Sequence, residues 1–412
     1  MTLIIDTASL IGGGILLLLV LAATLTDVFL RKSRRTENPL VAHEADEVQA
    51  TDVVQETNED HEADEVKEMA EASCDYPPVS IIVTPHDKAY ELDQHLPLLL
   101  EQDYPAPFRI IVVFWRGESE TDDVLKKYAA NPHLYATYIP DSSRYMSRKK
   151  LAITVGEKAA TTEWLLLTDV TCRPQSKYWL RAMARHATQE RNLVIGHTRF
   201  DDDTPPFRRF LRSYTSLYLQ QELARGTAYR CEGNALMLRR SEFEKRDGFR
   251  ANLKYLRGEY DFIVNEYARP GATAFENSED GTLLELCPTD KAWRNKLLYY
   301  MEDRRHMART AAHRWRHNLA QTLLHLSVVA LLASVLWACL TARWILVAWA
   351  VLLLAVTIGL RTWICLRALC SMDEDQPASR LFLYEMRLLW HYLAFHVRYH
   401  RANKDDFITH KV

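Results

Sequence analysis

Carboxylate, lysine and arginine side chains follow apolar runs at several places in the middle of this 412-residue chain. Such groups can hold a hard divalent cation, neutralise phosphates or take up a proton. The chain lacks a glycine-rich phosphate loop, a zinc-ligand spacing and a nucleophile elbow, which excludes the enzyme classes that depend on those motifs. The segments that carry the charged groups are 84–105, 114–123, 147–174 and 258–261.

The elements that must position these segments alternate between two periodicities. Short runs rich in β-branched and aromatic residues predict strands at 79–84, 109–114, 134–138, 164–168 and 193–197. Helical spacing predicts helices at 91–101, 121–130, 148–160 and 177–187. This alternation predicts an α/β fold with a mostly parallel sheet and helices on both faces. Ligands of such sheets bind at the carboxyl ends of the strands, so we expect the charged segments to share one site.

In their order and spacing these segments resemble family 2 glycosyltransferases, in the bacterial membrane-anchored branch with a GT-A, Rossmann-like fold. The resemblance covers residues 77–310. It rests on the stretches PVSIIVTPHD, RIIVV with GESETDDVL, SRKKLAITVGEKAATTEWLLLTDVTCRP, YRCEGNALMLRRSEFEKRDGF and GEYDFIVNEYA. It implies a nucleotide-sugar donor, so the site must hold two phosphates and neutralise their growing negative charge.

Three residues match positions that have defined roles in that family. Asp169 matches the first Asp of the DxD motif, which implies an anchor for Mg²⁺ or Mn²⁺, with a helix cap as the structural alternative. Lys150 matches the nucleotide-side lysine and would face the phosphates, with an exposed helix lysine as the alternative. Asp261 matches the base that takes the proton of the acceptor hydroxyl, and a helix cap is again the alternative.

The resemblance assigns further residues to each substrate. On the donor side it places Thr84, Asp87, Glu118 and Arg294, and on the acceptor side Gly233, Asn234 and Trp293. Residues 293–300 fall where the family carries an element that closes over the pyrophosphate and stacks the acceptor sugar. An amphipathic helix that leads into a membrane segment would show the same pattern, so both interpretations stay open.

The motifs depart from the family pattern at four positions. Phe114 and Trp115 stand where carboxylates usually follow the second strand, Thr171 replaces the second Asp of DxD, and Tyr260 replaces an acidic residue. A neutral hydroxyl binds Mg²⁺ much less well than a carboxylate, so Thr171 is a doubtful metal ligand. Residues 201–203, three consecutive Asp, could form a substitute metal site, although a solvated loop is the simpler interpretation. The departures indicate either an altered donor or impaired turnover.

Three apolar runs predict three transmembrane helices, at 8–25, 323–340 and 344–360, because about 20 apolar residues cross a bilayer. Basic residues flank the runs on the side expected to face the cytosol. They are Arg31, Lys32, Arg34 and Arg35; Arg304, Arg305, Arg309, Arg314 and Arg316; and Arg361 and Arg367. The predicted topology has the N-terminus outside, the middle of the chain in the cytosol, and a tight outer hairpin.

The predicted domain organisation follows from these runs. It comprises an anchor at 1–35, an acidic disordered linker at 36–76, the glycosyltransferase domain at 77–310, a transmembrane hairpin at 319–361 and a cytosolic tail at 362–412. The linker repeats HEADEV at 43–48 and 61–66 and is too poor in large apolar residues to form a core. In the tail, 381–399 is a candidate interfacial helix, whereas 207–223 could lie on lipid or on the domain core.

These features together predict a membrane-bound, inverting, metal-assisted glycosyltransferase on the cytosolic face of a bacterial inner membrane. Its acceptor would be lipid-linked or a polysaccharide. A net charge of −3 gives no reason to expect nucleic acid, and seven Cys without a CxxC pair fit a reducing compartment. The alternative is a catalytically impaired relative that acts as a binding or assembly subunit of an envelope polysaccharide system.

Overall fold

The computed structural model describes residues 7–30, 76–139 and 147–407. Residues 31–75, which contain nearly all of the predicted acidic linker, lie outside the described residues. The chain forms two compact units. The helical unit consists of Met1–Arg34, Asp202–Arg225 and Pro288–Lys404, and the α/β unit of Arg35–Asp201, Gly226–Cys287 and Asp405–Val412. The predicted domain 77–310 therefore contributes residues to both units.

The α/β unit is built on a seven-stranded sheet in the order β3-β2-β1-β4-β8-β6-β9. Strands β3, β2, β1 and β4 are parallel, whereas β8 runs antiparallel to both of its neighbours. The strands are β1 (Val79–Val83), β2 (Phe108–Trp115), β3 (Leu134–Ile139), β4 (Trp164–Thr168), β6 (Leu193–Gly196), β8 (Leu236–Arg239) and β9 (Thr273–Glu276). The predicted, mostly parallel sheet is confirmed.

Helices cover both faces of this sheet, and every residue of β1 and β4 is buried. On one face Ile81 packs with Leu96, and on the other a Cβ on Gly156 would lie only 2.7 Å from Ile82 Cγ2. The helices are α4 (Ala89–Leu100), α5 (Ser119–Lys127), α6 (Arg148–Ala159), α7 (Trp179–Ala184), α9 (Arg240–Lys245), η2 (Arg250–Asn252) and α10 (Glu259–Tyr267). The predicted helices are present, and α7 is shorter than expected.

A second, three-stranded sheet was not predicted. It has the order β5-β10-β7, with β5 (Cys172–Pro174), β7 (Thr198–Phe200) and β10 (Leu283–Glu285). Its strands are only three residues long, and its pairs join segments more than 80 residues apart. β5 begins three residues after Asp169, so this sheet fixes the chain that leaves the end of β4.

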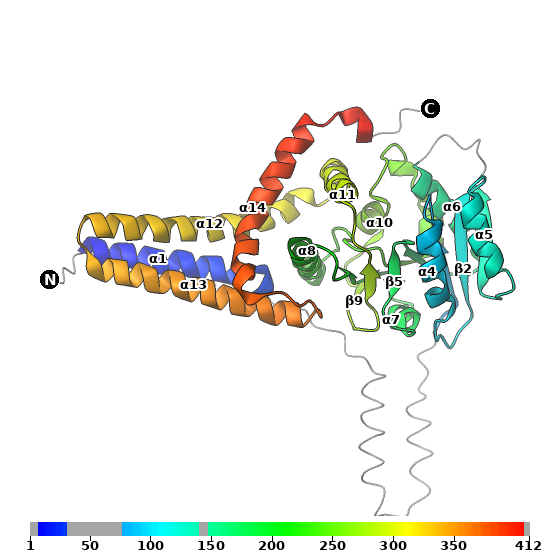
Figure 1. The fold of residues 1–412 in the computed structure, drawn as a ribbon, viewed down its shortest axis with the longest axis horizontal. Coiled ribbons are helices and arrows are strands. Elements are labelled where there is room, and N and C mark those ends of the chain that lie inside the picture. The colour runs from blue at the N-terminus through cyan, green and yellow to red at the C-terminus, as the bar shows by residue number, and fades with distance from the viewer. Residues whose placement is uncertain (1–6, 31–75, 140–146, 408–412) are drawn as a thin grey trace, which may run out of the picture. The chain divides into compact units, whose positions relative to one another are not determined.

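The helical unit contains six α-helices in the described part of the chain. They and the short helices beside them are α1 (Thr7–Leu25), η1 (Val28–Leu30), α8 (Pro206–Arg225), α11 (Asp290–Asp303), α12 (Thr310–Leu340), α13 (Trp344–Cys370), α14 (Ala378–Arg401) and η3 (Lys404–Phe407), which continues into the other unit. Figure 1 shows α1 between α12 and α13. Leu16 and Val20 of α1 pack there against Leu331, Ala350 and Leu353.

Two of the three predicted transmembrane helices meet the length and composition expected of a span. They are α12 and α13, whereas the apolar part of α1, Ser9–Leu25, is a shorter apolar helix. The prediction of three spans is therefore corrected to two. The shorter helix α1 packs against both longer helices.

The two amphipathic segments of the sequence differ in their surroundings. In α8 the apolar residues Phe210, Leu211 and Leu217 are buried, so this face is packed against protein, but within the helical unit and not on the core of the α/β unit. In α14, Leu383 and Trp390 are exposed on one face.

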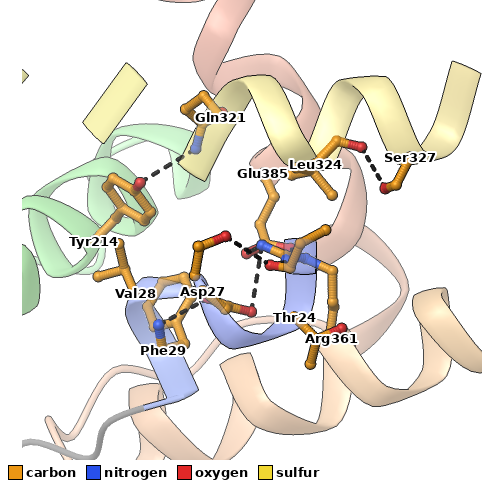
Figure 2. A network of polar contacts seen from close by, with 12 residues as sticks. Thr24, Asp27, Val28, Phe29, Tyr214, Gln321, Leu324, Ser327, Arg361 and Glu385 are labelled. Carbon is orange, nitrogen blue, oxygen red and sulfur yellow. Dashed lines mark hydrogen bonds and ion pairs between the residues drawn. The ribbon is translucent and has the colours of Figure 1, made fainter. Parts of the chain in front are cut away.

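A buried polar network ties the end of α1 to α13 and α14 (Figure 2). Arg361 donates to both carboxylate oxygens of Glu385, at 2.9 and 3.0 Å, and its Nη2 lies 3.3 Å from Asp27 Oδ2. The same guanidinium donates to the carbonyl oxygen of Ala23 at 2.9 Å. All three charged side chains are almost fully buried, so each depends on the others for charge compensation.

Candidate active site

The loop after β4 is organised by Asp169. Its Oδ1 accepts hydrogen bonds from the backbone N–H of Thr171 at 3.0 Å and from the Thr171 hydroxyl at 2.8 Å. No helix begins here, because Cys172 opens β5 instead. The helix-cap alternative for Asp169 therefore does not apply, and the carboxylate holds the turn between a strand of each sheet.

Two lysines face the Asp169 carboxylate. Lys149 Nζ lies 2.6 Å from Oδ2, and Lys88 Nζ lies 3.9 Å from Oδ1. Burial alone would raise the pKa of Asp169, but the two ammonium groups outweigh it and hold that pKa well below its usual range. Burial likewise opposes charge on Lys149, yet Asp169 holds the pKa of Lys149 above its usual value. The pair is therefore ionised at neutral pH.

The structure places Lys150 differently from its predicted position at the phosphates. Its side chain is fully buried, and Nζ donates to the carbonyl oxygens of Asn252 at 2.7 Å and Tyr255 at 2.8 Å. The ammonium group also lies 4.9 Å from the centre of the Phe262 ring. Lys150 thus anchors the segment that leads into α10, and Lys149 is the lysine of α6 that meets Asp169.

A sequence signal for Lys149 exists in the small residues of α6. Ala152 and Gly156 lie three and seven residues after it, on the same helix face. Gly156 sits where a Cβ would meet Ile82 and Val113, so this face is pressed against the sheet. A lysine on that face near the start of α6 must reach toward the carboxyl ends of the strands.

We expect Lys150→Met to destabilise the α/β unit by about 1–3 kcal/mol, because two buried carbonyl groups lose their donor. Thermal unfolding of the purified chain measures the effect. Lys158→Met, an exposed lysine of the same helix, is the matched control and should change little. Equal melting temperatures for the two variants would contradict the anchoring role of Lys150.

The start of α10 places Tyr260 beside this ion pair. The helix follows Gly258, whose φ of 82° lies in the left-handed region that favours glycine. Lys149 Nζ lies 4.7 Å from the centre of the Tyr260 ring. Burial raises the pKa of the Tyr260 phenol above its usual value, so it stays protonated. Tyr260, which departs from the family pattern, thus stacks on Lys149 through its ring.

Asp261 is held by a different segment of the chain. Its Oδ1 accepts a hydrogen bond from the backbone N–H of Cys231 at 3.2 Å, and Arg230 Nη1 lies 3.7 Å from Oδ2. The side chain is 13% exposed, so part of the carboxylate can still be reached. This hydrogen bond runs to another loop, thirty residues earlier, and ties α10 to the residues before β8. Sequence reasoning missed Arg230, for which the motif gave no signal.

The loop before β8 contains Gly233 and Asn234. A Cβ on Gly233 would lie 2.3 Å from Thr198 Oγ1, so only glycine allows this approach to β7. The backbone N–H of Asn234 donates to the same hydroxyl at 3.2 Å, and its side-chain amide donates to Cys172 Sγ at 3.3 Å. Burial raises the pKa of the Cys231 thiol to about 12, which fits a packed rather than a reactive cysteine.

These contacts link the two acidic residues. Asp169 binds Lys149, Lys149 packs on Tyr260, and Tyr260 precedes Asp261 in α10. Asp261 accepts a hydrogen bond from Cys231 in the loop before β8. Asn234 of the same loop donates to Cys172 of β5. These contacts connect the segment with a charged pair that can face an anion to the segment with a carboxylate that can accept a proton.

A second polar group follows β1 and β2. His86 Nδ1 lies 2.9 Å from Glu118 Oε1, and Arg148 lies 2.7 Å from His86 Nε2. The Arg148 guanidinium also lies 5.3 Å from the centre of the Trp115 ring. Asp87 is exposed at 3.5 Å from His86 and has a φ of 54°. His86 and Arg148 were not predicted as site residues.

Thr84 directly follows β1, and Phe114 is the next-to-last residue of β2. The Thr84 hydroxyl is buried and has no hydrogen-bond partner among the described residues. Phe114 is nearly buried and packs edge-on against Tyr138, with ring centres 6.5 Å apart. The aromatic replacement at 114 is therefore part of the packing of the sheet.

The residues around Asp169 do not fit a divalent cation well. Both carboxylate oxygens already have partners, two of them lysines, and Thr171 offers only a neutral hydroxyl. Within the described ranges, the His, Cys, Asp and Glu side chains close enough to hold a metal together are His86, Asp87 and Glu118, and Arg148 competes for the same imidazole. Asp201 instead accepts a hydrogen bond from the backbone of Cys287 at 2.9 Å.

Trp293 and Arg294 belong to the helical unit. Trp293 lies in the first turns of α11, is 6% exposed, and has the Arg208 guanidinium 5.3 Å from its ring centre. Its predicted role as an open stacking surface for a sugar does not fit this burial. Arg294 is exposed, and its Nε donates to the carbonyl oxygen of Asp290 at 3.2 Å.

Comparison with known proteins points to one family. Residues 60–244 match the model described as glycosyl transferase family 2, a region that includes Asp169 and ends before Asp261. No curated protein matches the chain.

Solved structures resemble the fold. Mannosyltransferase PcManGT from Pyrobaculum calidifontis, in complex with GDP-Man and Mn²⁺, is 18% identical with a TM-score of 0.46, over 76% of this chain and 88% of that chain. S. aureus TarS 1-349, in complex with UDP-GlcNAc, is 13% identical with a TM-score of 0.40, over 60% of this chain and 71% of that chain. These likenesses concern the fold alone.

Proposed function

We propose that this chain, whose residues 60–244 match the model of glycosyl transferase family 2, moves a sugar from a nucleotide-sugar donor to a lipid-linked or polysaccharide acceptor, with inversion. One observation carries the proposal. Lys149 contacts both the Asp169 carboxylate, at 2.6 Å, and the ring of Tyr260, at 4.7 Å. Lys149 therefore joins the carboxylate proposed for the donor side to the first turn of α10, which carries Asp261, the carboxylate proposed for the acceptor.

In the proposed step the acceptor hydroxyl oxygen attacks the anomeric carbon while Asp261 takes its proton. The new carbon–oxygen bond forms opposite the leaving group, and the bond to the diphosphate oxygen breaks. Its electron pair leaves with the nucleoside diphosphate, where negative charge grows and needs neutralising. Asp261 suits the role of base because it is held in place by Cys231 and remains partly exposed.

The helical unit supports a membrane location. Only 22% of the most apolar window of α12 and 28% of that of α13 are buried, which fits contact with lipid better than a protein core. Arg304, Arg305 and Arg309 lie before α12, and Arg361 and Arg367 lie in the last three turns of α13. We infer that the α/β unit lies in the cytosol, at the inner membrane of a bacterium, and that α14 lies on the lipid surface.

A second function is favoured by one observation. Thr171 stands at the second Asp of the motif, and its hydroxyl is used to bind Asp169. A relative impaired in this way could act as a binding or assembly subunit of an envelope polysaccharide system.

Turnover of nucleotide sugars separates the two functions. The full chain in detergent is mixed with UDP-glucose, UDP-N-acetylglucosamine or GDP-mannose and bacterial lipid extract, and released UDP or GDP is measured. We expect release from at least one donor. Donor binding without release would favour the assembly subunit, and the absence of any nucleotide binding would overturn the proposed enzyme.

A further inference from the structure

The ligands around Asp169 differ from those that hold a divalent cation. Hard cations such as Mg²⁺ and Mn²⁺ take several oxygen ligands, usually with more than one carboxylate or the substrate phosphates. Asp169 is joined by Thr171, whose single hydroxyl proton is donated to Asp169 Oδ1 at 2.8 Å. Within the described residues, the group that could hold a metal includes neither Asp169 nor Asp261.

Two lysine ammonium groups lie beside the oxygens of the Asp169 carboxylate. Lys149 Nζ lies 2.6 Å from Oδ2, where the hydrogen bond is short and charge-assisted. Lys88 Nζ lies 3.9 Å from Oδ1, and its side chain is 38% exposed. A cation bound to Asp169 would have to displace Lys149 or stand against both ammonium groups. Like charges at such distances oppose each other strongly in a partly buried site.

The two lysines supply the charge that a metal ion would bring. A divalent cation carries two positive charges, and two ammonium groups carry the same number. Lys149 is fixed between Asp169 and the Tyr260 ring, 4.7 Å from its centre, so its position is set before any ligand binds. Lys88 is more exposed and makes a longer contact, so it can turn toward an incoming phosphate.

We propose that Lys149 and Lys88 take the place of the divalent cation at Asp169, so that the diphosphate of the donor binds without metal. The inference rests on the proposed function, because it assumes a nucleoside diphosphate at this end of the sheet. Asp169 then positions Lys149 and does not itself ligate a metal.

Binding of UDP and GDP to the full chain in detergent, measured by calorimetry, tests the inference. We expect at least one of them to bind with the same affinity in excess EDTA as in Mn²⁺. Binding that needs Mn²⁺ or Mg²⁺ would overturn the metal-free site while leaving the glycosyltransferase in place. Failure of both nucleotides to bind under either condition would overturn the proposed function, and the inference with it.

Lysine variants test whether Lys149 is responsible for nucleotide binding without metal. Lys149→Met should weaken binding in EDTA roughly 10- to 100-fold, as expected for loss of a bond to a charged group. Lys158→Met, which removes an exposed lysine from the same helix, is the charge-matched control and should leave binding unchanged. Equal affinities for these two variants would contradict the role of Lys149.

A double variant that restores a metal site tests the same inference if Lys149→Met folds poorly. Lys149→Ala combined with Thr171→Asp restores a second carboxylate and removes the competing ammonium group. We expect this double variant to bind the nucleotide only when Mn²⁺ is present. Mn²⁺ binding to the unchanged chain and to Asp169→Asn is also measured directly by electron paramagnetic resonance. Any Mn²⁺ that the unchanged chain binds should be bound by Asp169→Asn with the same affinity. Its loss in that variant would place a metal at Asp169 and overturn the inference.

Discussion

Asp261→Asn is expected to lower the rate of sugar transfer by about 10²- to 10⁴-fold, the usual contribution of a general base. The amide oxygen can still accept the hydrogen bond from the Cys231 backbone, so the loop before β8 should keep its position. Nucleotide affinity should therefore be unchanged, and the loss should appear in kcat. Steady-state rates with the donor found active, together with calorimetry, measure the two effects separately.

The matched control for this variant is Asp123→Asn, which removes an exposed carboxylate of α5. It should leave both the rate and the affinity unchanged. A rate for Asp261→Asn within a few-fold of the unchanged chain would show that another group takes the proton. Loss of nucleotide binding in Asp261→Asn would instead indicate a structural role through the contact with Cys231.

Arg361→Met is expected to destabilise the helical unit by about 3–5 kcal/mol, because Asp27 and Glu385 would remain buried without their positive partner. The guanidinium is only 4% exposed and joins three segments, through Ala23, Asp27 and Glu385 (Figure 2). Thermal unfolding in detergent, followed by fluorescence, measures the loss.

Two variants distinguish loss of charge pairing from loss of packing. Arg367→Met changes an exposed arginine of the same helix and should have little effect. The triple variant Asp27→Asn, Arg361→Met, Glu385→Gln removes all the charges and should be more stable than Arg361→Met alone. A triple variant as unstable as the single one would contradict the charge argument.

The main sheet and its helices could be predicted because their signals are local. Short, mostly apolar runs such as 79–83 and 164–168 form strands buried on both faces. The helices between them follow the 3.6-residue period, as in α4 and α6. The small sheet of β5, β10 and β7 could not be predicted, because three-residue strands carry little periodicity and pair with distant partners.

The boundary of the α/β unit also escaped prediction. Residues 206–225 and 290–303 read as parts of the predicted domain 77–310, yet they pack in the helical unit. Their apolar faces have the same local pattern in either position. Long-range packing alone decides which neighbours cover them.

At the site, the sequence determined which kinds of group are present, and the tertiary structure decided which of them meet. The position of Asp169 at the end of β4 follows from the strand pattern. The choice of Lys149 over Lys150 is harder, because neighbouring helix residues point about 100° apart. Ala152 and Gly156 indicate which face of α6 packs on the sheet, but only the tertiary structure shows that Lys149 reaches Asp169 and that Lys150 binds the carbonyl groups before α10.

The same division holds for the helical unit. Its long apolar helices can be recognised from composition, because crossing a bilayer requires about 20 apolar residues in succession. The pairing of Arg361 with Asp27, more than 300 residues away, has no local signal. Ion pairs of this kind depend on which helices pack together, so the sequence determined the elements and their chemistry while only the tertiary structure decided the partners.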